Sequence, residues 1–348
     1  MTAALTFAAI GIDHGHILNM AAGMQAAGAT FAGWWGEEGS PVLPRFLERF
    51  GDVPRAATPE QLLDDPGIAL VLIASVPSAR AGHALAAMAA GKDVMVDKPG
   101  CTTLDQLDRI RRAVAQTGRI WSVNFSERFQ VASATMASDL VAAGVIGEVV
   151  NTVGLGPHRL GPGGRAPWFY DRAQYGGILA DIASHQIDQF LHYTGAATAE
   201  VTLATVANRA NPDHPGLQDF GELALRSARA TGYVRVDWFT PGALSVFGDG
   251  RLTLLGTEGY IELRKYVEIG QPPRKDNLYL VTGTRCERID CGGAGTPYFA
   301  RLAADIRDRT ETAMAQSHAF EVTRLALEAQ ALAERGTVWE AGPSRKGT

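Results

Sequence analysis

An aspartate and a histidine lie four residues apart in the stretch Gly176-Gly177-Ile178-Leu179-Ala180-Asp181-Ile182-Ala183-Ser184-His185-Gln186-Ile187-Asp188. Apolar residues recur here at helical spacing until Gly195, so we expect a helix with Asp181 and His185 on one face. A carboxylate one turn from an imidazole can orient the ring while the ring acts as general base on a hydroxyl. Such pairs are also common as solvated or structural groups, so other features of the chain must decide.

A lysine follows the apolar run Asp93-Val94-Met95-Val96, in Asp97-Lys98-Pro99. We expect the run to be a buried strand, which would place Lys98 at its carboxyl end. An ammonium there could donate a hydrogen bond to a reacting oxygen and stabilise its alkoxide character. The alternative is a surface lysine at a strand end.

The composition is that of an ordinary globular protein. With 348 residues we expect two domains, 1–124 and 125–348. The net charge of −5 gives no basic footprint for nucleic acid. No signal peptide or membrane-spanning run is evident, which favours a cytoplasmic protein. The three cysteines lack Cys-x-x-Cys spacing, so we expect neither a disulfide framework nor a zinc site.

Strand and helix signals alternate in the first domain, which predicts a parallel, doubly wound Rossmann sheet with ligands beyond the carboxyl ends of its strands. The expected strands are 5–10, 30–35, 69–74, 93–96 and 120–123. The helices between them are expected to end at Ala27, Phe50, Ala90 and Thr117.

The turn after the first strand only partly matches a dinucleotide fingerprint, G-x-G-x-x-G. It reads Gly11-Ile12-Asp13-His14-Gly15-His16-Ile17. Gly11 can make the tight turn, but Asp13 and His16 stand where glycines are usual. We expect Asp13 to cap the next helix while the backbone N–H groups of His14, Gly15 and His16 face the phosphates. The rival hypothesis is a metal site of Asp13, His14 and His16; we favour capping and predict no metal.

An acidic residue after the second strand should bind the ribose hydroxyls. Glu37 fits that position, with Glu38 next, and no arginine follows immediately to bind a 2′-phosphate. The sequence therefore favours NAD over NADP, although NADP stays possible. A solvated turn charge is the alternative for Glu37.

The second half has the strand and turn signals of an α+β domain with a large, mostly antiparallel open sheet. The expected strands are 149–153, 201–206, 221–225, 231–239, 243–247, 251–255 and 260–263. Gly248-Asp249-Gly250 and Gly256-Thr257-Glu258-Gly259 are hairpin signals. Helices are expected over 302–308 and 320–335. The loop from Gly156 to Gly177 could be a lid whose residues His158, Arg165 and Trp168 bind substrate; an ordinary loop packing its own aromatic residues is the alternative.

Four segments together resemble the Gfo/Idh/MocA family, named for glucose-fructose oxidoreductase, inositol dehydrogenase and a rhizopine-catabolism protein. They are Ala90-Gly91-Lys92-Asp93-Val94-Met95-Val96-Asp97-Lys98-Pro99, Gly144-Val145-Ile146-Gly147-Glu148-Val149-Val150, the Asp181 helix and Gly256-Thr257-Glu258-Gly259. The resemblance runs almost end to end. It implies NAD(P)-dependent oxidation or reduction of sugars, polyols and inositols, and an open sheet used for dimer or tetramer contacts.

Carried over residue by residue, the family's catalytic lysine, aspartate and histidine fall on Lys98, Asp181 and His185. Further cofactor contacts are expected at Ser75, Val76, Pro77, Asp97, Lys98 and Asn124. The chain departs from the family pattern at three places besides Asp13. Its E-K-P glutamate is Asp97, His16 replaces a glycine, and the Thr-Pro-Asn segment with its histidine becomes Ser75-Val76-Pro77-Ser78 with Arg80.

Hydride transfer requires a base on the alcohol oxygen, and we expect His185 to be that base, Asp181 to orient it and Lys98 to stabilise the oxygen. A small polar substrate and a homodimer or homotetramer complete the prediction. Two alternatives stay open: a non-catalytic, nucleotide-responsive regulator of transcription, and a glycoside-processing enzyme that uses tightly bound NAD transiently.

Overall fold

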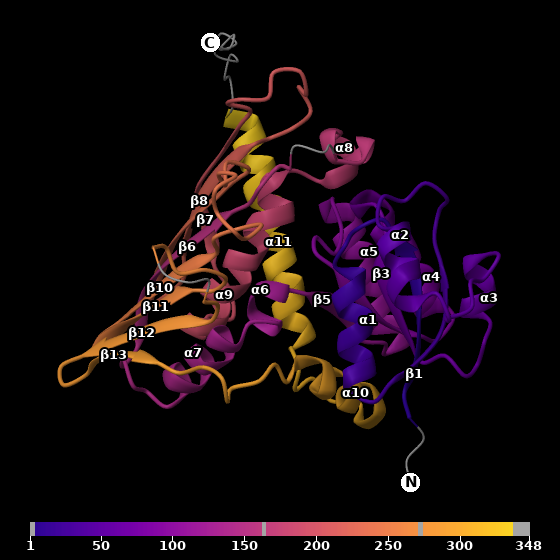
Figure 1. Cartoon of the computed structure of the whole chain (residues 1–348), viewed down its shortest axis with the longest axis horizontal. Coiled ribbons are helices and arrows are strands. Elements are labelled where there is room, and N and C mark those ends of the chain that lie inside the picture. Colours follow the sequence, from indigo (N-terminus) through magenta and orange to yellow (C-terminus); the bar gives the residue numbers. More distant parts are fainter. Residues whose placement is uncertain (1–3, 162–164, 271–273, 337–348) are drawn as a thin grey trace. The chain divides into compact units, whose positions relative to one another are not determined.

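The computed structural model describes residues 4–161, 165–270 and 274–336, which form two compact units (Figure 1). Unit 1 contains the chain up to Asn124 together with Ala173–Gly176 and Pro297–Thr323. Unit 2 contains Phe125–Arg172, Gly177–Thr296 and the chain from Arg324.

Unit 1 is built on a parallel sheet of five strands in the order β2-β1-β3-β4-β5, as the alternating signals predicted. Its strands are β1 (Thr6–Ile12), β2 (Thr30–Trp35), β3 (Leu70–Ala74), β4 (Asp93–Asp97) and β5 (Trp121–Asn124). Its helices are α1 (Ile17–Ala26), α2 (Leu43–Phe50), α3 (Pro59–Leu63), α4 (Pro77–Ala89), α5 (Leu104–Thr117) and α10 (Tyr298–Asp308). Because the winding reverses between β1 and β3, the crevice outside the carboxyl ends of these strands is where such sheets bind ligands.

Unit 2 is built on an eight-stranded sheet in the order β13-β12-β11-β10-β6-β9-β8-β7, in which only the pair β6 and β9 is parallel. Its strands are β6 (Val149–Pro157), β7 (Glu200–Ala207), β8 (Phe220–Arg226), β9 (Thr231–Asp237), β10 (Arg251–Gly256), β11 (Gly259–Arg264), β12 (Asn277–Thr282) and β13 (Cys286–Ile289). The mostly antiparallel sheet is the predicted one.

The helical segments of unit 2 are short before the long C-terminal helix. They are α6 (Ser126–Phe129), α7 (Ala132–Ala142), a 3₁₀ turn η1 (Pro167–Tyr170), a π-helical segment η2 (Leu179–Ala183) and α9 (Ser184–Thr194). Two further helices, α8 (Arg172–Tyr175) and α11 (Gln316–Gly336), contain residues of both units.

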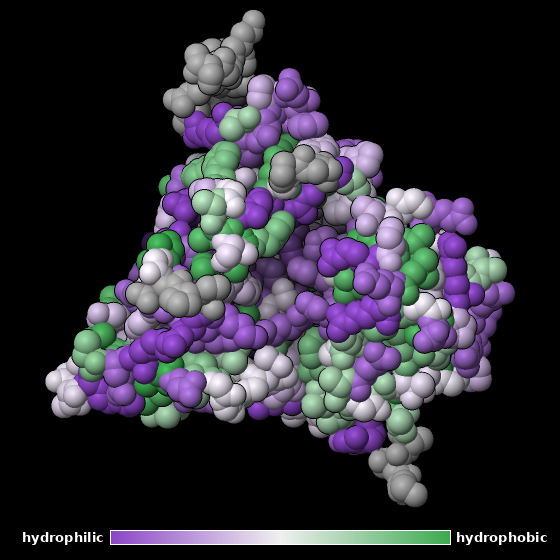
Figure 2. All heavy atoms as spheres, in the orientation of Figure 1, coloured by the Kyte–Doolittle hydropathy of each residue, from purple (hydrophilic) through white to green (hydrophobic). Residues whose placement is uncertain are grey.

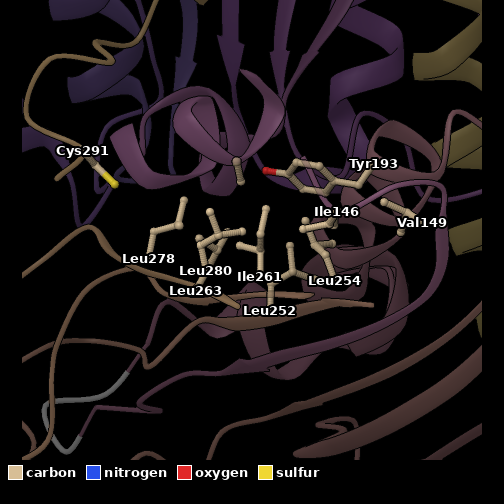
Figure 3. Packing of buried hydrophobic residues seen from close by; sticks show 11 residues of the cluster. Ile146, Val149, Tyr193, Leu252, Leu254, Ile261, Leu263, Leu278, Leu280 and Cys291 are labelled. Carbon is tan, nitrogen blue, oxygen red and sulfur yellow. The ribbon is translucent and has the colours of Figure 1, made fainter. Parts of the chain in front are cut away.

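The core of unit 2 lies between its helices and one face of the sheet. Figure 3 shows Leu252, Leu254, Ile261 and Leu263 of β10 and β11 pointing toward Tyr193 of α9. Residues alternate along the strands, so the opposite face carries partly exposed side chains, among them Tyr233 and Leu255. One face of the sheet is therefore apolar and covered, as is common in antiparallel sheets.

Two local predictions are wrong. Residues 243–247 form turns and bends instead of a strand, so Gly248-Asp249-Gly250 does not close a hairpin. By contrast, the turn Gly256-Thr257-Glu258-Gly259 joins the paired strands β10 and β11, as predicted. Strands β12 and β13 had not been predicted.

No helix in the described part of the chain is long and apolar enough to cross a membrane. In Figure 2, hydrophilic and hydrophobic residues are interspersed over the visible face of each unit.

Candidate functional site

The first turn of unit 1 lies at the point where the winding of the sheet reverses. Gly11 has φ +75°, and a Cβ there would lie 2.3 Å from Cβ of Ser75, so only glycine fits. A Cβ on Gly15 would meet no atom within 4 Å, which leaves the approach to α1 open to a ligand. The N–H groups of Asp13 and His14 both donate to the carbonyl of Ala74. The prediction that the His14 N–H faces a phosphate is therefore wrong.

Asp13 does not cap α1, because its carboxylate accepts from the N–H of Val76 at 3.2 Å and α1 has no side-chain cap. That contact joins the turn after β1 to the start of α4. Burial raises the pKa of Asp13, and the nearby charge of Glu37 adds to the effect. The predicted residues Gly11, Asp13, Ser75 and Val76 are thus neighbours at one edge of the sheet.

The two histidines of this turn contact Asp97, at the end of β4. Nδ1 of His14 lies 2.7 Å from one carboxylate oxygen, and Nδ1 of His16 lies 2.8 Å from the other. Nη2 of Arg80 donates to the same carboxylate at 3.1 Å. Burial alone would raise the pKa of Asp97, but His16, Arg80 and His14 together hold it well below its usual range. Asp97 is therefore a buried anion with three partners.

His14, His16 and Asp97 are also a group whose ligand atoms all lie within 4.8 Å of one another, whereas Asp13 of the rival metal hypothesis is not part of it. The observed separations are those of hydrogen bonds. A cation would have to displace these bonds and lie beside the guanidinium of Arg80. Coulomb repulsion therefore disfavours a metal here, and the absence of a metal site stays our prediction.

Lys98 follows Asp97 and is 4% exposed. Its carbonyl accepts from Nη1 of Arg80, and the peptide bond to Pro99 is cis. Asn124, at the end of β5, pairs in register with Asp97 and is fully buried. The structure thus places Asp97, Lys98 and Asn124 at the carboxyl ends of two adjacent strands.

Glu37 is exposed just beyond β2. It follows Gly36, where a Cβ would lie 2.5 Å from the side chain of Ile12. An arginine that the sequence reasoning did not consider is also present. Nη2 of Arg55 donates to the carbonyl of Gly36 at 3.0 Å, and Nη1 lies 3.6 Å from Glu38. The end of β2 therefore offers both a carboxylate and a guanidinium.

In unit 2, the segment with Asp181 and His185 starts differently from the predicted α-helix. Gly177 has φ +90°, and the orphan N–H groups of Ile178 and Leu179 donate to the side chains of Gln218 and Gln330. Residues Leu179–Ala183 are π-helical, and the regular α-helix begins only at Ser184. Turns of both kinds keep residues four apart on about the same side. Asp181 and His185 are both buried, at 8% and 2% exposure.

The predicted loop residues gather on aromatic side chains of unit 2. The ring of His158 lies 5.6 Å from that of Trp238 and 5.5 Å from that of Phe247. The guanidinium of Arg165 lies over the same two rings, at 5.0 and 5.1 Å. Burial lowers the pKa of Arg165, while the charge of Asp181 raises it. Trp168 contacts Phe169 edge-on, at 5.8 Å. Residues 162–164 of this loop lie outside the described part.

A buried ion pair near His185 escaped prediction. Nζ of Lys265 donates to Glu127 at 2.5 Å and to Gln189 at 2.8 Å, and Gln189 in turn donates to the carbonyl of His185. The charge of Lys265 lowers the pKa of Glu127 to about 2 against the effect of burial, and His185 and His158 contribute. The sequence gives little indication of this pair, because Glu127 and Lys265 are 138 residues apart and belong to no common motif.

A cavity of about 560 Å³ lies on the face of the unit 2 sheet that is opposite its helices, and it is lined partly by Pro157, Asp237 and Phe239. Because side chains alternate along a strand, His158 and Trp238 point away from it. The residues that line it include none of the predicted site residues, so we do not identify it with the candidate active site.

Comparison with known proteins identifies the family and agrees with the fold of both units. Residues 37–125 match the oxidoreductase family with an NAD-binding Rossmann fold, and residues 135–262 match the GFO/IDH/MocA C-terminal domain. The crystal structure of a candidate oxidoreductase from Erwinia carotovora atroseptica SCRI1043 is similar, with a TM-score of 0.91 and 47% identity, over 94% of this chain and 98% of that one.

Two curated relatives from Bacillus subtilis (strain 168) are scyllo-inositol 2-dehydrogenases. The NADP(+) enzyme is 31% identical over 154 residues, which are 44% of this chain and 42% of that protein. The NAD(+) enzyme is 29% identical over 209 residues, which are 58% of this chain and 57% of that protein. The chain thus spans only about half the length of these relatives. Both halves of the chain nevertheless match one family, and the protein belongs to the Gfo/Idh/MocA family of NAD(P)-binding oxidoreductases.

Proposed function

We propose that the protein transfers hydride between a nicotinamide dinucleotide and a secondary alcohol or ketone of an inositol, sugar or related polyol. The observation that carries the proposal is the buried Lys98, held at the carboxyl end of β4 in a Rossmann sheet. An ammonium at that edge serves an oxygen whose negative charge grows during the reaction. The inositol dehydrogenases among the relatives supply the substrate class.

The residues at the sheet edge fit a dinucleotide. Gly11 allows the close approach of β1 and Ser75, the space beside Gly15 is open, and Glu37 is exposed at the end of β2. When bound, the nicotinamide would supply the site that accepts or donates hydride. Because Arg55 lies beside Glu38, the end of β2 does not strongly reject a 2′-phosphate. Glu37 still favours NAD, since its carboxylate would accept hydrogen bonds from both ribose hydroxyls.

The protein's own residues then have separate roles. His185 takes the proton of the substrate hydroxyl, and Asp181 orients the imidazole or binds a neighbouring hydroxyl. Lys98 donates a hydrogen bond to the reacting oxygen. His158, Arg165 and Trp168 offer polar and aromatic surface to the rest of the substrate.

The test is a panel of inositols, sugars and sugar acids, mixed with NAD or NADP and followed by the absorbance of the reduced nicotinamide. The compound that reacts is then used in single-turnover measurements on Lys98→Met and His185→Ala. We expect Lys98→Met to lose a factor on the order of a hundred to a thousand in rate, with little change in NAD affinity.

Lys92 provides a matched control, because it is 5% exposed, precedes β4 and donates to the carbonyl of Asp65. Lys92→Met should destabilise the fold and leave the single-turnover rate nearly intact. If Lys98→Met behaves like this control, Lys98 is structural and the nucleotide-responsive regulator becomes the better hypothesis.

A further inference from the structure

We infer that Arg80, a residue that makes no contact with the reaction in the function proposed above, is a positioning residue that fixes the backbone on both sides of Lys98. The inference rests on that proposed function, because it concerns the lysine to which we assign the reacting oxygen.

Arg80 lies in the first turn of α4, and its side chain is completely buried. Nη1 lies within hydrogen-bonding distance of three successive carbonyls, those of Asp97, Lys98 and Pro99. Nε donates to the carbonyl of Ser75 at 2.9 Å. One guanidinium therefore ties the backbone that precedes and follows Lys98 to the end of β3.

These carbonyls need a donor of this kind. They lie at or beyond the end of β4, where the ladder to the neighbouring strands stops, and buried carbonyls without a partner are costly. Only arginine offers five N–H donors in a rigid planar fork, whereas lysine has a single nitrogen on a flexible stem. The contacts of Arg80 with Ser75 and with the Asp97–Pro99 segment use separate nitrogen atoms of the fork.

The position of the charge also calls for an explanation. A cation in the first turn of a helix opposes the helix dipole, and a buried guanidinium loses its hydration. The carboxylate of Asp97 offsets both costs, since it accepts from Nη2 at 3.1 Å and is itself held by His14 and His16. Arg80 and Asp97, which are fully buried, and the two half-buried imidazoles thus form one cluster that ends at the carbonyl of Lys98.

A rigid backbone matters because a hydrogen-bond donor in catalysis has to lie within about 0.5 Å of its productive position, and a displacement of about 1 Å can cost a factor of a hundred. Arg80→Lys keeps the charge next to Asp97 but cannot bond all these carbonyls at once. We therefore expect the ammonium of Lys98 to shift and the chemical step to slow.

The experiment compares Arg80→Lys, Arg80→Ala and the control Arg309→Lys in the full-length protein. Arg309 is a matched arginine of the same unit, since it pairs with Asp93 at the opposite end of β4 and donates to the carbonyl of Gly118. For each variant we would measure single-turnover hydride transfer with scyllo-inositol or the other panel compound that reacts, NAD affinity, thermal unfolding and the crystal structure around Lys98.

Arg80→Lys should lower the single-turnover rate 10- to 100-fold with NAD affinity within twofold, and its crystal structure should show Lys98 displaced by more than about 0.5 Å. Guanidinium ion at a sub-denaturing concentration should restore part of the rate of Arg80→Ala. Arg309→Lys should lose only thermal stability. Suppose that Lys98→Met is slow, but Arg80→Lys has the wild-type rate and an undisplaced Lys98. That result would overturn the positioning role of Arg80 and leave the proposed function standing. An unimpaired Lys98→Met would instead overturn the proposed function.

Discussion

Replacing Glu127 by glutamine should destabilise the protein far more than the loss of one hydrogen bond would. The carboxylate is 2% exposed and the ammonium of Lys265 is fully buried, so Glu127→Gln would leave a buried cation with amide partners alone. Breaking a buried pair in this way costs about 3 to 5 kcal/mol. The pKa of Glu127 leads to a similar figure: it falls from 4.5 to about 2 on folding, and at about 1.4 kcal/mol for each pKa unit this is roughly 3 kcal/mol.

The pH dependence gives the prediction a second signature. Because the folded-state pKa of Glu127 is depressed, its contribution is fully present above pH 4.5 and is lost as the pH falls from 4.5 toward 2. The difference in unfolding free energy between wild type and Glu127→Gln should therefore stay constant between pH 6 and 8, and should shrink below about 4.5. Urea unfolding at a series of pH values measures it.

Two comparisons make this test specific. Adding Lys265→Met to Glu127→Gln should restore much of the lost free energy of unfolding, because no buried charge is then left unpaired. Glu287→Gln should cost less than about 1 kcal/mol, since Glu287 pairs with Arg285 in the same unit with both side chains more than 40% exposed. A cost below 1 kcal/mol for Glu127→Gln at pH 7, or a double variant weaker than the single one, would refute the reasoning.

Three further predictions concern the cofactor, the histidine cluster and assembly. Calorimetry should show NAD binding more tightly than NADP, and Glu37→Ala should weaken NAD by about 1 to 2 kcal/mol; equal affinities would contradict it. Burial lowers the pKa of His14 from 6.5 to about 4, so wild type should lose stability as the pH falls through this range and His14→Asn should lose less. Light scattering should show a homodimer or homotetramer at micromolar concentration, and glutamate at the partly exposed Tyr233 and Leu255 of the open sheet face should favour monomers.

The sequence predicted the parallel sheet because each of its strands is a short apolar run separated from the next by a helix. It predicted β10 and β11 because glycine-containing segments precede β10 and separate it from β11. Strands β12 and β13 were missed: β13 reads Cys-Glu-Arg-Ile and is largely exposed, so it has no apolar pattern to detect.

The failure at residues 243–247 has a cause that no local pattern contains. Nη2 of Arg159 lies within hydrogen-bonding distance of the carbonyls of Pro241, Gly242, Leu244 and Val246. A side chain more than 80 residues away in the sequence thus satisfies backbone groups that a strand would satisfy through a ladder. Alternating apolar residues indicate which side chains can be buried, but they do not say what the backbone bonds to.

In the candidate site too, the sequence pattern identified residues but not the contacts between them. The sequence pattern identified Asp181 and His185 as a pair and Lys98 separately, and it treated Asp97, Arg80 and His16 as separate departures from the family pattern. In the structure His16 and Arg80 both contact the carboxylate of Asp97, and His14 contacts it as well. An aspartate is one methylene shorter than the glutamate it replaces, and the two imidazoles and the guanidinium reach it from β1 and α4. His16 replaces a fingerprint glycine and bonds Asp97, while Arg80 replaces a histidine and bonds both Asp97 and the backbone of Lys98. Asp97 thus accepts hydrogen bonds that His16 and Arg80 supply. Changing one of these three residues back to the family's residue should therefore destabilise the protein more than changing all three back together.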